Sequence, residues 1–304
     1  MKKWFIRGAW LVLLVFLIFS TSKLLIRLIP GDPVDVIMSE TGELVDRETL
    51  AKEMGLDRAY FPSLVQQTKE ALKGDLGKSL FQKKPITQIL GSRLKNSAEL
   101  AVLSLLTGLL IAFGLTLLSS LPSKTQPYWD RIQNFHSVWV ASLPTVWIAP
   151  VFAYLFAVYF QIFPLGGSVW LPALTLGYCL SGFWTRALRE TLKVELAREH
   201  VRAARARGLG EINILLRYGL YPALGPWIAF LGTQTGFLFS GAIIVETVFD
   251  WPGLGSLLIE SIFKRDYPLI ETTLFISASL ILSGNLLGDF LQEMIHPKMR
   301  GHSP

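Results

Sequence analysis

The stretch GDLGKSL, residues 74–80, is one of the few places in this chain where residue types and spacing point to chemistry. Its Gly-Lys-Ser triplet is typical of loops that cradle nucleotide phosphates. That motif also needs a glycine five positions before the Gly-Lys pair, and Leu72 stands there. The sequence therefore favours a plain turn at 74–80 over a nucleotide site.

Other reactive side chains are too few or badly spaced for catalysis. The four histidines form neither H-x-x-x-H nor H-E-x-x-H, so nothing supports a metalloprotease. A single cysteine, Cys179, excludes an internal disulfide and a thiolate metal cluster. Neither G-x-S-x-G nor G-x-G-x-x-G occurs. We predict that the chain is not an enzyme, with no catalytic residues and with no metal or cofactor of its own.

The densest run of charge lies over residues 186–220, where 12 of 35 residues are Asp, Glu, Lys or Arg. Helical spacing there separates a basic stripe from a face of small apolar residues. The stripe consists of Arg198, Arg202 and Arg205, and the other face holds Val201 and Ala204. Because Gly208 and Gly210 then interrupt the pattern, we predict a short amphipathic helix, a glycine hinge and a second helix.

The elements around this run are unusually apolar. Hydrophobic residues make up 51% of the chain and charged residues 17%, against about 25% charge in soluble domains. One uncharged block, Ile132–Thr185, is 54 residues long, whereas a bilayer-spanning helix needs about 20. Backbone hydrogen bonds must be satisfied within lipid, and the blocks lack the alternation of barrel strands. We predict an all-α polytopic membrane protein whose six transmembrane helices cover 8–28, 99–121, 136–160, 169–186, 221–245 and 272–293, with a turn at 163–167.

The distribution of lysine and arginine predicts the orientation. The N-terminal tail, the second connection, the 186–220 segment and the C-terminal tail carry three, two, eight and two of these residues. With six spans, these four segments lie on one side of the membrane. Of the two short connections on the other side, residues 161–168 carry no lysine or arginine, and the later one carries two, Lys264 and Arg265. The positive-inside rule then places both termini and the 186–220 segment in the cytoplasm. The net charge of +6 reflects this topology, so no nucleic-acid partner is expected.

Several stretches, in order along the chain, resemble ABC importer permeases of the dipeptide/oligopeptide/nickel type, and in particular their B-type subunit. They are LIPGDPVD (28–35), GDLGKSL, YWDR (128–131), SLPTVWIA (142–149), VETVFDWPGLGSLL (245–258), RDYPLI (265–270) and HPKMR (296–300). Residues 202–208 are similar to the family signature E-A-A-x-x-x-G, although Arg202 replaces the glutamate. The later I-x-L-P element is imperfect, because Pro222 and Pro226 do not have the family's spacing.

The resemblance implies a type I permease core in a bacterial inner membrane. It implies an N-terminal tail and first helix (1–29), an extracytoplasmic segment with a helical lobe (30–96), a five-helix core (97–296) and a cytoplasmic tail (297–304). The implied partners, besides the lipid bilayer, are a second homologous permease, two cytoplasmic ATPases that bind ATP and magnesium, and an extracytoplasmic solute-binding protein.

The resemblance also implies roles for two groups of residues. A coupling helix that contacts an ATPase would contain Glu199, Arg202, Ala203, Ala204, Gly208 and Leu209. The alternatives from spacing alone are a solvated basic loop that fixes topology and an ion pair between Glu199 and an arginine one turn later. An extracytoplasmic turn over the pathway would contain Trp251, Pro252, Gly253 and Gly255, and the alternative is simple loop punctuation. Glu246 and Asp289, at the edges of spans, are further candidates, either functional or interfacial.

The expected function is therefore import of peptides by an ATP-driven, binding-protein-dependent system. Import of nickel or another metal chelate by the same family is an alternative, and an ATP-independent channel or a membrane scaffold is an alternative of another class. A secondary transporter is disfavoured, since the chain shows no similarity between its halves.

Overall fold

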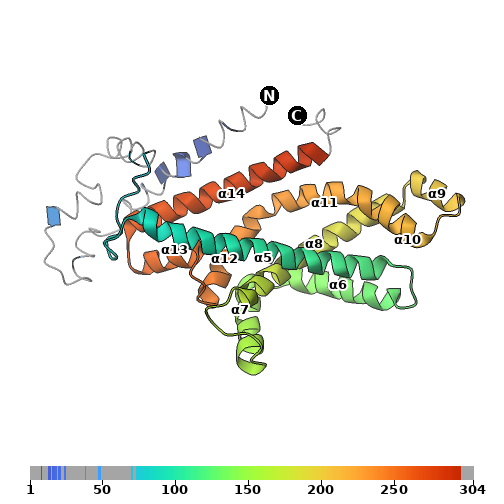
Figure 1. Ribbon diagram of the computed structural model, residues 1–304, viewed down its shortest axis with the longest axis horizontal. Coiled ribbons are helices and arrows are strands. Elements are labelled where there is room, and N and C mark those ends of the chain that lie inside the picture. Colours follow the sequence, from blue (N-terminus) through green and yellow to red (C-terminus); the bar gives the residue numbers. More distant parts are fainter. Residues whose placement is uncertain are drawn as a thin grey trace. The chain divides into compact units, whose positions relative to one another are not determined.

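The computed structural model describes residues 73–295, together with residues 8, 13, 14, 16–18, 20, 21, 24, 38, 47, 48 and 70 (Figure 1). Most of the predicted first span, most of the 30–96 segment and the 297–304 tail lie outside the described residues. Between 73 and 295 the structure is helical, with one isolated antiparallel bridge between Lys78 and Pro85. The elements are α5 (Ile86–Ser120), α6 (Gln126–Ser142), α7 (Thr145–Phe152), π-helix η1 (Ala153–Tyr159), α8 (Trp170–Leu196), α9 (Glu199–Ala206), α10 (Glu211–Asn213), π-helix η2 (Ile214–Leu220), α11 (Tyr221–Thr233), α12 (Thr235–Val248), α13 (Leu254–Phe263) and α14 (Tyr267–Ile295).

The chain divides into two compact units, Met1–Asn96 with Pro252–Leu282 and Ser97–Trp251 with Ser283–Pro304. In the first unit, an apolar cluster joins the start of α5 to α13 and to the start of α14. Its buried members are Ile86, Ile89, Leu90, Leu254, Leu257 and Leu269. Residues after Trp251, which the sequence analysis assigned to the 97–296 core, thus pack with the end of the 30–96 segment.

The core of the second unit is built around two buried tryptophans. Trp227 on α11 donates its indole N–H to the backbone carbonyl of Trp184 on α8, at 2.9 Å. The Phe113 ring of α5 meets Trp227 edge-on, with ring centroids 4.8 Å apart. Because a buried indole N–H needs an acceptor, this arrangement fixes α11 against α8 while α5 covers the ring.

Glycines allow very close helix crossings in the second unit. A Cβ at Gly108 of α5 would lie 2.7 Å from the Trp184 ring and 2.9 Å from the Gly177 carbonyl oxygen. Beside this crossing, the Thr107 hydroxyl donates to the Ala173 carbonyl at 3.1 Å. Helices in lipid associate through tight van der Waals packing and interhelical hydrogen bonds, since no hydrophobic force drives them together. The α5–α8 contact has both features.

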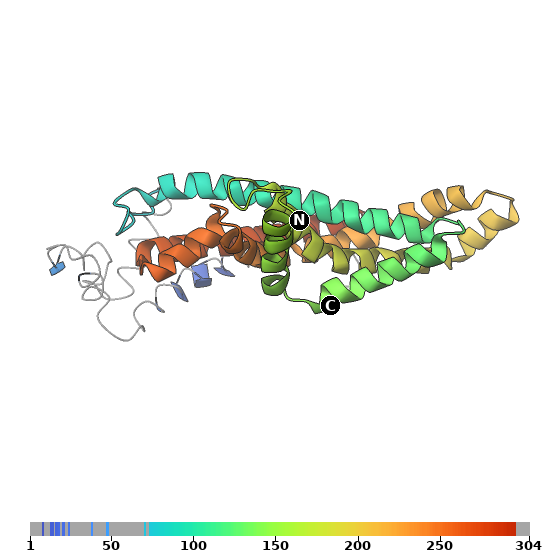
Figure 2. The ribbon, with the colours of Figure 1, turned by 90° about the horizontal axis from the view of Figure 1, so that it is seen from below.

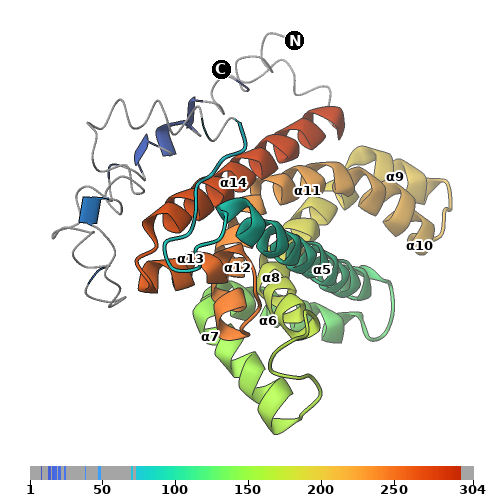
Figure 3. The same cartoon turned by 60° about the vertical axis from the view of Figure 1, so that its left-hand side comes forward.

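The span predicted at 136–160 is not one continuous helix. Helix α6 ends at Ser142, and the pair formed by α6 and α7 with η1 is bent by 110°. The cause is Pro144, which disfavours a helical residue before it, and Leu143 is extended (φ −100°, ψ 125°). Figure 2 and Figure 3 show α7 turned away from the direction of α6. The turn predicted at 163–167 is confirmed, with Gly167 at φ +73°.

Two other predicted spans differ from the structure. Helix α8 continues ten residues past the predicted end at 186, because no glycine or proline follows until Gly208. The span predicted at 221–245 breaks at Gln234, between α11 and α12. By length and composition, the described residues contain three helices able to cross a membrane, within Ile86–Ser120, Glu211–Thr233 and Tyr267–Gly288, or four spans if the bent pair counts as one. The predicted number of six spans is not confirmed.

Helix α5 also exposes a band of large apolar side chains. Val102, Leu106 and Leu110 recur at helical spacing and are 57%, 49% and 72% exposed. A contiguous apolar surface of this kind marks a membrane or protein contact. It agrees with the assignment of α5 as a span.

Candidate functional site

The charge-rich segment forms a helical hairpin at the end of α8. Helix α9 begins after Arg198, whose backbone is extended (φ −72°, ψ 157°), and α10 and η2 lead back into α11. Figure 1 and Figure 2 show α9 and α10 at the tip of the pair formed by α8 and α11. The predicted order of short helix, glycine hinge and second helix is confirmed, although η2 is a π-helix, a rare form that often occurs at functional sites.

One face of α9 is buried against η2. Val201 and Ala204 are 0% and 1% exposed and pack with Ile214. The His200 Nε2 lies 3.1 Å from the Tyr218 carbonyl oxygen, so this nitrogen carries the proton and donates it. Of the two alanines assigned to the coupling helix, Ala204 therefore packs within the hairpin, on the face that the spacing gave it with Val201, whereas Ala203 is exposed.

The opposite face of α9 is exposed and partly paired. Glu199, Arg202 and Ala203 are exposed, and neither charged residue forms a salt bridge with any residue in 73–295. The ion pair considered for Glu199 is thus not formed. Arg205 instead makes two hydrogen bonds to Glu211 on α10, at 3.0 and 3.2 Å, which close the hairpin with a fork-to-carboxylate contact.

Gly208 ends α9 through its backbone conformation. Its φ is +77°, in the left-handed region that side chains disfavour, and a Cβ added at this position would meet no atom within 4 Å. The Gly208 amide donates to the Arg205 carbonyl at 2.9 Å, and the Leu209 amide donates to the Ala204 carbonyl at 3.4 Å. These two bonds define a Schellman motif, in which Leu209 also packs against the cluster of Val201 and Ala204. The glycine is needed for the turn itself and not for space.

Two groups of contacts join this hairpin to the rest of its unit. Arg189 on α8 donates hydrogen bonds to Asp130 and Asn134 on α6. Leu121, just after α5, packs in a cluster with Leu192 and Leu215. Sequence reasoning missed Arg189 because it lies inside a run of eight basic residues and has no distinguishing spacing. The YWDR stretch, which contains the Asp130 partner of Arg189, was the one signal in the sequence that could have pointed to this contact.

Glu246 on α12 is a buried acid. Its side chain is 1% exposed, and the Ser97 hydroxyl of α5 donates to it at 2.6 Å. Burial of a carboxylate is costly unless hydrogen bonds satisfy it, so this contact fixes α12 against α5 within the second unit.

Comparison with known proteins decides the family. Residues 104–301 match the family described as binding-protein-dependent transport system inner membrane component. The chain belongs to this family. It is a permease subunit of an ABC importer of the dipeptide/oligopeptide/nickel class.

Curated relatives match this permease over nearly its full length. It is 32% identical over 295 residues to the glutathione transport system permease protein GsiC of Pectobacterium atrosepticum, covering 95% of the permease and 94% of the relative. The GsiC protein of Escherichia coli strain K12 is 28% identical over 291 residues, with 94% of each chain covered. Such relatives are transport subunits.

A solved structure supports the same fold for the permease. A chain of a crystal structure titled as an amino acid ABC transporter with histidines superposes with a TM-score of 0.56. It is 18% identical and covers 68% of the permease and 94% of the solved chain. At this identity the likeness establishes the fold alone.

The second predicted group of the permease, Trp251 to Gly255, forms a tight turn between α12 and α13. The Trp251 amide donates to the Glu246 carbonyl at 2.8 Å, and Asp250 before it has φ +49°. Gly253 caps the start of α13, where its amide donates to the Ser256 hydroxyl oxygen at 3.0 Å. Gly255 lies within α13 and is buried. The turn geometry is therefore explained locally, by helix capping.

Proposed function

We propose that the permease lines the translocation pathway of an ATP-driven importer of short peptides, with glutathione as the first substrate to test. The observation that carries this proposal is the 32% identity to a permease named for glutathione transport, over 95% of the chain. The membrane surface on α5 and the close helix crossings fit a subunit that works inside a bilayer. A solute-binding protein, a second permease and two ATPases that hold ATP and magnesium complete the proposed importer.

The hairpin containing α9 is the proposed contact with an ATPase. Its exposed face presents Glu199, Arg202 and Ala203, while its other face packs on η2. Through Arg189 and the Leu121 cluster, a push on this hairpin would reach α6 and the end of α5. ATP-driven closure of the ATPases would then move packed helices as rigid bodies, which is how related switches work.

The topology proposed for this mechanism places α9 and both termini in the cytoplasm. Its support is the excess of lysine and arginine in the 186–220 segment. In this arrangement the turn with Trp251, Pro252, Gly253 and Gly255 lies on the extracytoplasmic side, at the end of the pathway.

The test is ATP hydrolysis by the complete importer in proteoliposomes. The complex is supplied with its binding protein and with glutathione, dipeptides, longer peptides or a nickel chelate in separate reactions. We expect glutathione or short peptides to stimulate hydrolysis and to accumulate in the vesicles. Stimulation by the nickel chelate alone would contradict the peptide assignment, and solute movement by the permease without ATPases would contradict the importer mechanism.

A further inference from the structure

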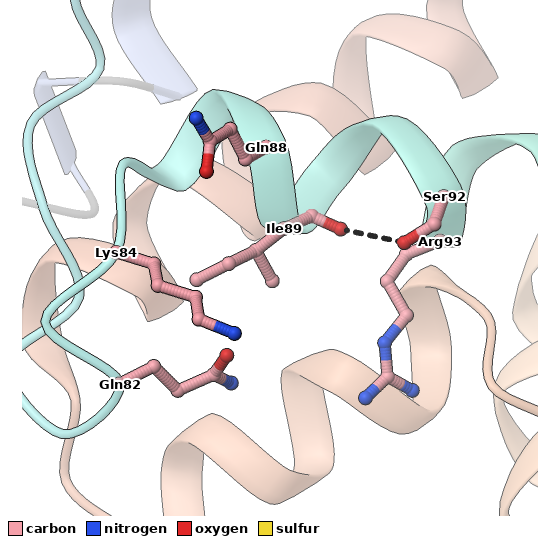
Figure 4. A pocket seen from close by; sticks show the side chains of 6 residues that line it. All are labelled: Gln82, Lys84, Gln88, Ile89, Ser92 and Arg93. Carbon is pink, nitrogen blue, oxygen red and sulfur yellow. Dashed lines mark hydrogen bonds between the residues drawn. The ribbon is translucent and has the colours of Figure 1, made fainter.

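A polar pocket of about 350 Å3 lies at the start of α5, within the first compact unit (Figure 4). Two of its residues come from the loop before α5 and four from the first turns of the helix. They are Gln82, Lys84, Gln88, Ile89, Ser92 and Arg93. None of these six residues belongs to the hairpin of α9 and α10, here called the coupling hairpin, or to the turn from Trp251 to Gly255.

The pocket has an excess of positive charge. Lys84 and Arg93 extend to the same side of α5, with the Gln82 amide next to the Lys84 ammonium (Figure 4). Arg93 binds Glu260 at 3.2 Å, and Lys264 shares the same carboxylate at 2.7 Å. Lys84 makes no salt bridge with any residue in 73–295. Two cations therefore share one carboxylate while Lys84 has no ion pair in that range, and the positive end of the α5 dipole lies beside them.

Backbone hydrogen bonds hold the loop that carries Gln82 and Lys84. The Ser79 amide donates to the Lys84 carbonyl at 3.0 Å, and the Lys83 amide donates to the Ser79 carbonyl at 3.1 Å. The backbone amide of Gln82 donates to the Ser79 hydroxyl oxygen at 3.0 Å. A loop fixed in this way needs little ordering when a ligand arrives, which favours binding.

We propose that this pocket receives a carboxylate side chain of the solute-binding protein that serves the permease. Lysine, arginine and amide N–H groups are the donors that carboxylates prefer. Because Lys84, Gln88 and Ser92 are exposed, the pocket would leave a small free solute largely in water, whereas ligand sites normally bury most of their ligand. A docked protein would instead shield the carboxylate in the pocket from water, because the rest of its interface would cover the pocket.

The position of the pocket along the chain agrees with this partner. The pocket is at the first turns of α5, in the 30–96 segment, which the proposed topology places outside the cytoplasm. A membrane-spanning α5 has its two ends on opposite sides of the bilayer. The inference rests on the proposed importer function, in which the binding protein and the ATPases act from opposite sides.

The test is the affinity of the binding protein for the complete importer in lipid nanodiscs. Lys84→Glu should raise the dissociation constant about tenfold and flatten its dependence on salt, because a like charge then faces the incoming carboxylate. Lys95→Glu is the matched control, since Lys95 is exposed on the same helix and does not line the pocket. It should change the dissociation constant less than about twofold. Basal ATP hydrolysis should be unchanged in both variants, which shows that they are folded.

An unchanged dissociation constant in Lys84→Glu would overturn the proposal. So would a variant that binds the protein normally but needs more peptide for half-maximal stimulation, because the carboxylate would then belong to the solute. Charge reversal of the exposed acids on the binding protein, one at a time, should include one that restores binding to Lys84→Glu. The wild-type complex tests the importer function separately from the role of the pocket. If the loaded binding protein stimulates ATP hydrolysis by the wild-type complex, the importer function is supported whatever the pocket variants show.

Discussion

The Ser79 hydroxyl donates a hydrogen bond to the buried carboxylate of Asp266, 187 residues later in the chain. The other oxygen of Asp266 accepts the backbone amides of Leu80 at 3.2 Å and Leu269 at 3.4 Å. Asp266 therefore caps the start of α14 and holds the Gly-Lys-Ser stretch against it. The serine that a phosphate-binding loop would direct at a nucleotide here has a structural partner.

Replacement of Ser79 by alanine should destabilise the permease. The change leaves Asp266, which is 1% exposed, with one donor fewer, at a cost of about 1.5–3 kcal/mol for a hydrogen bond to a charged group. Thermal unfolding of the purified complex measures the effect. Ser92→Ala is the control, because Ser92 is exposed and donates to the Ile89 carbonyl at a long 3.3 Å, so its unfolding temperature should hardly move. Equal shifts for the two variants would contradict the role given to Asp266.

Gly208→Ala should weaken the hairpin that contains α9 through conformation alone. A side chain at φ +77° costs about 1–2 kcal/mol, although the space around it is open. Gly210→Ala is a matched control two residues away, since Gly210 has φ −63° and equally open space. Protease accessibility of the 198–220 segment should rise for Gly208→Ala and stay at the wild-type level for Gly210→Ala. The opposite order would show that the Schellman motif does not govern this turn.

Ala203 and Ala204 should respond differently to aspartate. Ala204→Asp places a charge in a site that is 1% exposed, which should cost about 3–5 kcal/mol and prevent assembly. Ala203→Asp lies on the exposed face, so the complex should assemble and keep its basal ATP hydrolysis. If α9 contacts an ATPase, stimulation of hydrolysis by the loaded binding protein should fall strongly in Ala203→Asp. Full stimulation in a correctly assembled Ala203→Asp complex would remove this face of α9 from the proposed contact.

The crossing of α11 and α14 should not tolerate a single methyl group. A Cβ at Gly232 would collide with the backbone of Gly288, and the reverse also holds, so the two helices must separate. Overpacking of this kind costs about 1–3 kcal/mol. Gly232→Ala should lower the unfolding temperature, whereas Gly114→Ala in α5, with no atom within 4 Å, should leave it unchanged or raise it slightly. An unchanged unfolding temperature in Gly232→Ala would show that the helices separate at no cost.

The sequence by itself determined the features that depend on composition and local rules. Long uncharged blocks predicted membrane helices, the charged segment with Gly208 predicted a short helix and a hinge, and family stretches predicted an ABC importer permease. The sequence also contained the bend after α6, because Leu143 precedes Pro144, but the apolar run around these residues concealed it.

Tertiary structure decided which face of each helix is used. Helical spacing placed Ala204 with Val201 on one face of α9, but only the tertiary structure shows that this face packs against Ile214 and is buried. Contacts between residues far apart in sequence, such as Ser79 with Asp266 or Gly232 with Gly288, leave no periodic pattern in either segment. Hydropathy records how much of a side chain avoids water, whereas partner choice depends on shape and hydrogen-bond geometry, which exist only after the chain has folded.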